Sequence, residues 1–133
     1  MKKARRDLLI YLIHESVFWY NTIMKSIGIE IPDEKRIIDE VVEVLLSYLQ
    51  PKRIILFGSR ARQRAGKYAD FDIAVEGVNM DIRMERFIKD KLDEKAGIYT
   101  IDLINLDKAD KDFRRIILQG GRVLYDGGSK ILT

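Results

Sequence analysis

The chain of 133 residues contains no cysteine and only one histidine. Without cysteine there can be no disulfide framework and no zinc site built on thiolates, and a single histidine cannot form a histidine-rich metal site. Any bound metal is therefore expected to be a hard cation on oxygen ligands, Mg²⁺ or Mn²⁺.

A long uninterrupted apolar run is also missing. The apolar stretch that begins at Leu8 is broken by His14, Glu15 and Asn21, whereas a membrane-spanning helix needs about 18 apolar residues or more. The basic residues in front of this stretch suit a signal peptide, but no small-residue cleavage site follows. We therefore expect a cytoplasmic protein with no membrane association.

The chain also lacks a large excess of charge of one sign. Its net charge is only +3, which is too small to argue for nucleic-acid binding. The distribution is more informative than the sum. Between Pro51 and Ala69 there are cations and no acid, and two acids follow closely, Asp70 and Asp72. The cations are Lys52, Arg53, Arg60, Arg62, Arg64 and Lys67. A basic stretch that leads into paired carboxylates is typical of a site that holds a polyanion together with a metal.

Apolar periodicity and helix-breaking residues predict the order of elements. We expect helices at 7–27, from Asp33 to a stop at Pro51, a short one at 60–64, one from Met84 to Gly97, and one ending near Gly120 and Gly121; strands are expected at 53–57, 70–75, 98–105 and 123–125. This order indicates an α/β fold with a mixed β-sheet flanked by helices. Residues 1–32 would form an extra apolar N-terminal helix and a candidate interface, and 127–133 a loose tail.

The segment that follows the first strand carries the predicted chemistry. Gly58 allows a phosphate to approach the backbone closely, Ser59 offers a hydroxyl, and a helix start would offer free N–H groups. Among the cations, Arg60 and Arg62 are the candidates for phosphate contacts. These four residues are the predicted nucleotide-binding set.

Three aspartates are the candidate catalytic and metal-binding residues. Asp70 and Asp72 are two residues apart on a predicted strand, so their side chains would share a face and could bridge a pair of divalent ions. Asp102 interrupts an apolar strand, where a carboxylate is unfavourable unless it is paired or bound to metal. If the two strands are neighbours, Asp102 completes the cluster; otherwise it pairs with an arginine. The acids Asp107 and Asp110 are expected in a solvated loop.

These residues resemble the minimal nucleotidyltransferases of the DNA polymerase beta-like superfamily. That family carries Gly-Ser, a spacer, Asp-any-Asp and a later Asp on a strand, which match Gly58-Ser59, Asp70, Asp72 and Asp102 over roughly residues 37–125. The chain departs from the pattern at Gln63, where the family often has Gly, and at Ala69, where it often has Ser. The resemblance implies a nucleotidyltransferase domain at 33–126 that uses Mg²⁺ or Mn²⁺ to transfer a nucleoside monophosphate, by default from ATP, to a hydroxyl.

The resemblance also implies a partner, because many minimal members pair with a small helical protein of the HEPN type. In some pairs the nucleotidyltransferase is an antitoxin that adenylylates a tyrosine of the toxin. A homodimer would be another way to complete the acceptor site. Two other functions stay open from the sequence: a non-catalytic nucleotide-binding subunit, and transfer to a small molecule.

Overall fold

The structure is a computed structural model, and it describes residues 23–28, 33–63, 65–66 and 69–128. The elements follow one another as α3 (Glu34–Tyr48), β1 (Arg53–Phe57), β2 (Phe71–Glu76), α4 (Ile82–Ala96), β3 (Ile101–Asn105), the 3₁₀ helix η1 (Leu106–Lys108), α5 (Lys111–Gly120) and β4 (Arg122–Asp126). The four strands form one sheet in the order β3-β2-β1-β4. Since β2 and β3 are parallel and the other pairs antiparallel, the predicted mixed sheet is confirmed.

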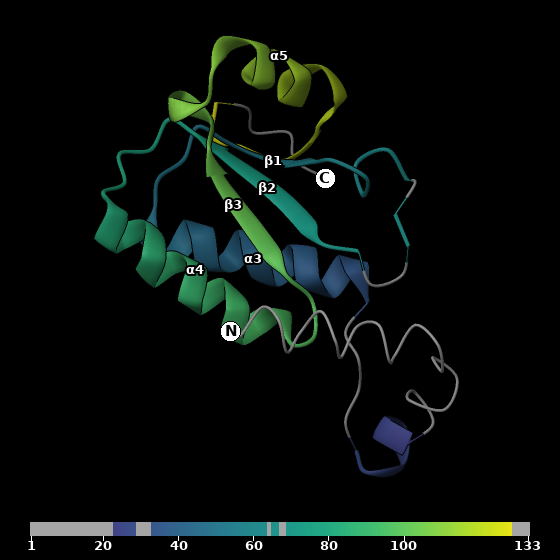
Figure 1. The fold of residues 1–133 in the computed structure, drawn as a ribbon. Helices are drawn as coiled ribbons and strands as arrows, with labels where there is room; N and C mark the ends of the chain where they lie inside the picture. Colours follow the sequence, from purple (N-terminus) through teal and green to yellow (C-terminus); the bar gives the residue numbers. More distant parts are fainter. Residues whose placement is uncertain (1–22, 29–32, 64, 67–68, 129–133) are drawn as a thin grey trace.

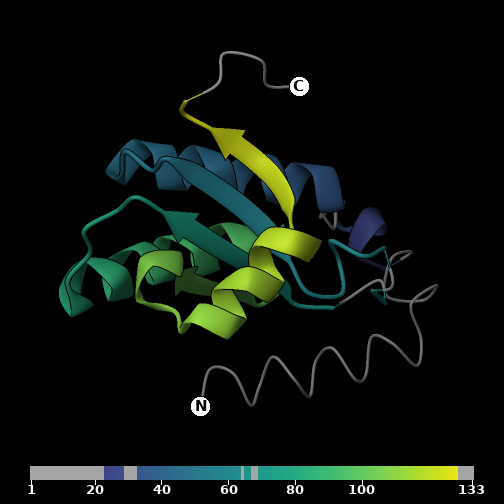
Figure 2. The same ribbon diagram turned by 90° about the horizontal axis from the view of Figure 1, so that it is seen from above.

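Helices cover both faces of this sheet (Figure 1). The pair α3 and α4 packs on one face, and α5 crosses the other, as the view from above also shows (Figure 2). The larger core lies between the sheet and the α3–α4 pair and includes Leu45, Ile73 and Leu92. A smaller cluster lies under α5 around Ala74 and Ile117. Successive side chains of a strand point alternately into these two cores. A polar side chain of the central strands must therefore lie on one face or the other.

Local capping explains where the helices begin and end. Asp33 caps α3 by accepting a hydrogen bond from the Arg36 N–H at 2.8 Å, as the sequence predicts. Gly97 ends α4 at a φ of 62°, a conformation that favours glycine, and Gly121 caps α5. The predicted limits of these helices are therefore confirmed within a few residues.

Two predicted elements are wrong in detail. Residues 58–63 form turns and no helix, and β3 begins at Ile101, three residues later than expected, because 97–99 form a turn after α4. Of the predicted N-terminal helix 7–27, only residues 23–27 are described, and 23–26 are helical; its other residues, and 129–133 of the predicted tail, lie outside the described residues. None of the helices within the described ranges is long and apolar enough to cross a membrane.

Candidate active site

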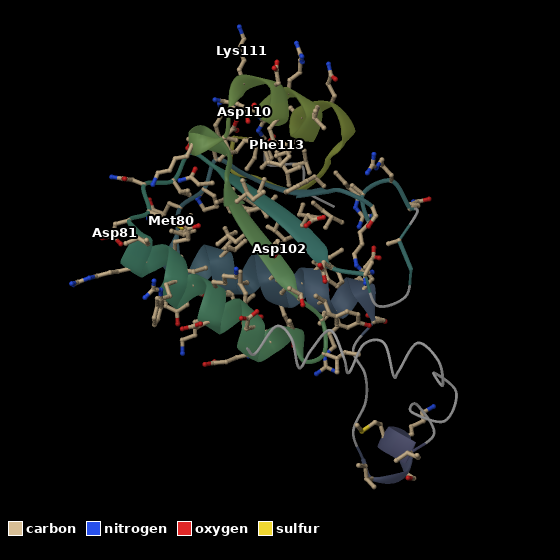
Figure 3. The ribbon with its side chains drawn as sticks, in the orientation of Figure 1. Met80, Asp81, Asp102, Asp110, Lys111 and Phe113 are labelled. Atoms are coloured by element: carbon tan, nitrogen blue, oxygen red, sulfur yellow. The ribbon has the colours of Figure 1, made fainter. Side chains whose placement is uncertain are left out.

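The central strands bring two of the predicted aspartates side by side. Asp72 of β2 and Asp102 of β3 are register partners in the parallel pair, so the predicted adjacency of the two strands is confirmed. Their neighbours Phe71 and Ile101 are fully buried in the core beneath α3 and α4. Because side chains alternate along a strand, both carboxylates lie on the opposite face, the one that α5 partly covers. Figure 3 shows Asp102 on β3, below α5.

Asp70 stands just before β2 rather than within it. Its charge still acts on Asp72. The pKa of Asp72 is raised to about 6, first by burial, then by the charges of Asp102 and Asp70, and last by a hydrogen bond with Asp102. A raised carboxyl pKa of this kind marks an excess of negative charge in a partly desolvated place. The three predicted aspartates therefore interact electrostatically, as the spacing implies.

These residues fit a hard divalent cation by their chemistry. Carboxylate oxygens are the ligands that Mg²⁺ and Mn²⁺ take up, and a cation would offset the burial and the carboxylate repulsion that raise the pKa of Asp72. Over the part of the chain that the structure describes, no three acidic or histidine side chains already stand around one point.

Gly58 closes the site from the side of β1. Phe57, the last residue of β1, is the register partner of Asp72, so the chain turns at Gly58 directly beside the carboxylate. Gly58 has a φ of 74°, and a Cβ on it would run into Oδ2 of Asp72 and lie 3.3 Å from its Cγ. Glycine is thus required here both for the backbone conformation and for the space. Ser59 follows, half-buried, in the same turn.

The turn after Gly58 replaces the helix that the sequence predicts. Arg62 N–H donates weakly to the Gly58 carbonyl at 3.4 Å, and Gln63 N–H donates to the Arg60 carbonyl at 3.3 Å. Gln63 has a φ of 56°, in the left-handed region that glycine adopts without penalty. Any backbone contact to a phosphate in this segment would therefore come from turn amides, with the Ser59 hydroxyl beside them, and not from a helix N-terminus.

Arg60 and Arg62, both predicted as phosphate contacts, lie in different environments. The Arg60 side chain is buried, and its guanidinium lies 3.9 Å from the centre of the Phe71 ring, on the face opposite Asp72. It donates to the Ala69 carbonyl at 2.7 and 3.0 Å and pairs with Glu34 at 3.0 Å. The structure thus brings Arg60 to the base of the loop before β2, away from the carboxylates. Arg62 is exposed in the turn.

Some site-supporting residues were missed by the sequence reasoning. Glu34 forms ion pairs with Arg60 and, at 3.1 Å, with Arg122 of β4. Nothing in the sequence points to this role except the place of Glu34 in the first turn of α3. Asp107 and Asp110 are exposed, as predicted, but each accepts a backbone hydrogen bond. Asp107 accepts from Gly77 at 2.8 Å and Asp110 caps α5. These acids stabilise the fold outside the cluster.

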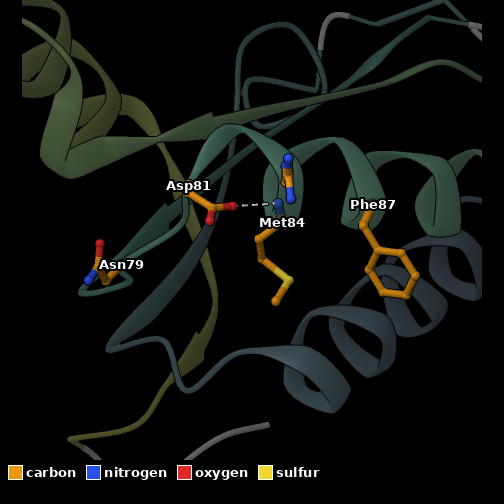
Figure 4. A pocket seen from close by; sticks show the side chains of 5 residues that line it. Asn79, Asp81, Met84 and Phe87 are labelled. Carbon is orange, nitrogen blue, oxygen red and sulfur yellow. Dashed lines mark hydrogen bonds between the residues drawn. The ribbon is translucent and has the colours of Figure 1, made fainter.

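A pocket elsewhere on the chain is separate from this site. It is lined by Asn79, Asp81, Arg83, Met84 and Phe87, at the start of α4 (Figure 4). Asp81 is the N-cap of that helix and accepts from the Met84 N–H at 2.8 Å. Because α4 packs on the face opposite the carboxylates, this pocket is not continuous with them.

Comparisons with known proteins agree with this geometry. The family model described as "Polymerase beta, Nucleotidyltransferase" matches residues 39–129. A curated relative from Haemophilus influenzae, named "Probable protein adenylyltransferase MntA", is 30% identical over 79 residues, which are 58% of this chain and 69% of the relative.

Solved structures extend the comparison to the fold. One is described as a toxin-antitoxin with AMP-PNP; a chain of it superimposes with a TM-score of 0.60 at 23% identity, over 67% of this chain and 73% of that one. Another is the tri-AMPylated HEPN toxin of Shewanella oneidensis in complex with an MNT antitoxin, with a TM-score of 0.55 at 23% identity, over 71% and 73%. At this identity the likeness shows the fold, which is the predicted polymerase beta-like one.

Proposed function

Because the chain belongs to the polymerase beta nucleotidyltransferase family, we propose that it transfers AMP from ATP to a hydroxyl of a partner protein. That it is a nucleotidyltransferase of the MntA type follows from the family match and from its relative. The donor, the acceptor and the metal are the proposed part. The single observation that carries the proposal is the pairing of Asp72 with Asp102 directly against Gly58.

The proposed roles follow from where each residue stands. Gly58 and Ser59 hold the triphosphate in the turn after β1, with the exposed Arg62 as its cationic contact. Asp70, Asp72 and Asp102 would hold Mg²⁺ or Mn²⁺, which on binding supplies charge stabilisation for the attacking and leaving oxygens. Arg60 supports the loop that carries Asp70, and we assign it no phosphate contact.

The reaction is an in-line displacement at the α-phosphorus. The acceptor oxygen forms a bond to phosphorus as the bond to the bridging oxygen breaks, and pyrophosphate leaves with the electron pair. The acceptor proton passes to a carboxylate, for which Asp102 is the candidate because it stands at the edge of the sheet, where β3 has one strand neighbour. In this proposal the turn amides and Arg62 hold the phosphate chain.

The proposed acceptor is a small helical protein of the HEPN type, so the chain would act as the antitoxin of a pair. Support comes from the relative that is named a protein adenylyltransferase and from the complex of an MNT antitoxin with an AMPylated HEPN toxin.

Labelling with α-³²P ATP tests this proposal. The full chain, co-purified with its partner, is incubated with Mg²⁺ and labelled ATP, beside the variants Asp70→Asn and Asp39→Asn. Asp39 is a matched control because its carboxylate is 62% exposed on α3, away from the cluster. We expect label on the partner with the native chain and with Asp39→Asn, and none with Asp70→Asn. Equal labelling by Asp70→Asn would refute the site, and no label with any chain would refute protein modification.

A further inference from the structure

An aromatic residue adjoins the carboxylate pair. Phe57 ends β1 and is the antiparallel register partner of Asp72. Directly opposite residues of an antiparallel pair project from the same face with their Cβ atoms about 5 Å apart. The Phe57 ring therefore flanks Asp72 on the face that carries the site, and it is only partly buried.

A second ring from a distant part of the chain extends this surface. Phe113, in the first turn of α5, packs against Phe57 with the ring centres 5.9 Å apart and the planes at 84°. The backbone of Phe113 is held at the start of α5, because its N–H donates to the capping carboxylate of Asp110 at 2.9 Å. Figure 3 shows Phe113 below α5, toward the sheet. Despite this contact, 36% of Phe113 is exposed, so part of its ring is open to a ligand.

We propose that Phe57 and Phe113 form the nucleobase subsite of this nucleotidyltransferase. The inference rests on the proposed function, since it takes a triphosphate held at Gly58 and Ser59 as its starting point. Phe57 is the residue next to Gly58, so the apolar surface begins where the phosphate site ends. A nucleotide is the kind of ligand that needs both surfaces at once, an anion site and an adjoining ring on which a base can stack.

The chemistry of the pair also indicates a specificity. Phenylalanine side chains have no hydrogen-bonding atoms, so these two rings recognise the face of a base and not its edge. Stacking of this kind tolerates any base, and the larger ring system of a purine makes more contact than a pyrimidine. We expect ATP and GTP to bind within a few-fold of each other, and CTP to bind more weakly than either.

The test separates the base from the phosphates. Binding of ATP and of inorganic tripolyphosphate, each with Mg²⁺, is measured by calorimetry on the full chain and on Phe113→Ala, Phe113→Tyr and Ile116→Ala. Ile116 is the matched control, an apolar residue of the same helix that is 64% exposed. In Phe113→Ala we expect ATP to bind roughly tenfold more weakly, within the range measured for loss of one stacked base. Tripolyphosphate should bind that variant as it binds the native chain.

The other variants complete the pattern. Phe113→Tyr keeps a ring and should bind ATP within about twofold of the native chain, and Ile116→Ala should match it. Unchanged ATP binding in Phe113→Ala overturns the subsite, and so does an equal loss for ATP and tripolyphosphate, which would mark a structural role. A native chain that binds both ligands equally overturns the subsite but leaves the transfer proposal standing. A native chain that binds neither overturns both.

Discussion

Asp72 is the residue at which the proposed activity and the stability of the fold oppose each other. Its pKa is raised to about 6 by burial and by the neighbouring carboxylates, so the folded chain holds this proton more tightly than the unfolded chain does, where the group titrates near 3.8. Stability is therefore expected to fall as the pH rises from about 4 to about 6, and to stay at the lower level above that.

Asp72→Asn should consequently stabilise the metal-free chain at pH 8 while abolishing transfer. The amide removes the charge but keeps the size of the side chain and can donate to Asp102. Thermal melts in EDTA at pH 5 and pH 8 provide the measurement: we expect a higher Tm for the variant at pH 8 and a smaller difference at pH 5. Mg²⁺ at pH 8 should raise the Tm of the native chain by more than that of the variant. A variant less stable than the native chain at pH 8 would contradict this interpretation.

Gly58 offers a test of how closely the backbone must approach the carboxylate. In Gly58→Ala the new methyl group would meet Oδ2 of Asp72 and occupy a backbone with a φ of 74°, so the side chain has to move or the turn has to change. We expect a loss of at least a hundredfold in kcat/KM, with a destabilisation of about 1–2 kcal/mol from the left-handed backbone. Gly66→Ala is the control, because nothing lies within 4 Å of the position that its new methyl group would take. Equal activity of the two variants would show that transfer does not need the close approach of the Gly58 backbone to Asp72.

At the scale of elements, the loop between β1 and β2 is organised by Arg60. Its guanidinium joins the Ala69 carbonyl, Glu34 of α3 and the Phe71 ring, so one side chain ties the loop to a helix and a strand. Arg60→Ala would remove all three contacts and leave the Ala69 carbonyl without this donor. We expect a destabilisation of about 1–3 kcal/mol, the size typical of leaving a hydrogen-bonding group unsatisfied, because the Glu34 side chain is 41% exposed and can be solvated without Arg60.

Arg62→Ala is the matched comparison, since Arg62 is exposed in the same turn. We expect it to change the free energy of unfolding by less than about 0.5 kcal/mol, and to weaken binding of ATP by several-fold. Urea denaturation measures the free energy of unfolding of each variant, and calorimetry measures its affinity for ATP. The reverse pattern, with a stable Arg60→Ala that binds ATP poorly, would restore Arg60 to the phosphate site.

The elements themselves could largely be predicted from the sequence, and the reason is local. The end of α4 at Gly97 and the cap of α3 at Asp33 depend on nearby residues only, and both were predicted. The turn at 58–63 was not, because the left-handed backbone falls on Gln63, and glutamine gives no sign of it. Arg60, Ala61 and Arg62 suit the start of a helix, but the contacts of Arg60 with Ala69, Glu34 and Phe71 hold this segment as a turn.

In the candidate site, too, features set by nearby residues could be predicted, and features set by tertiary contacts could not. The spacing of Asp70 and Asp72 and the lone Asp102 in an apolar strand identified carboxylates that the structure brings together. Which way a side chain leaves a turn is set by contacts from other elements, so the placement of Arg60 against Phe71 could not be read from spacing. The contact of Phe57 with Phe113 spans most of the domain and was equally beyond sequence reasoning.

For the whole molecule, the order β3-β2-β1-β4 is what assembles the site. Gly58, Asp72 and Asp102 come from three successive positions of the sheet, although they are far apart in the sequence. Two cores hold these strands, and every buried apolar residue of the described chain lies between Ile37 and Ile117. All the described strands and all the buried apolar residues of the described chain thus lie within residues 33–126, the segment that the sequence predicts as the nucleotidyltransferase domain.

This arrangement predicts that the segment 33–128 folds without residues 1–32. A chain that begins at Asp33 keeps the cap of α3, the ion pairs of Glu34 and the whole described core. We expect cooperative thermal unfolding with a Tm within a few degrees of that of the full chain, and unchanged binding of Mg²⁺ and ATP. If residues 1–32 serve as the interface, the truncated chain should lose its partner while it keeps nucleotide binding. A truncated chain that fails to fold would instead show that the N-terminal segment belongs to the domain, and the predicted boundary at residue 33 would be wrong.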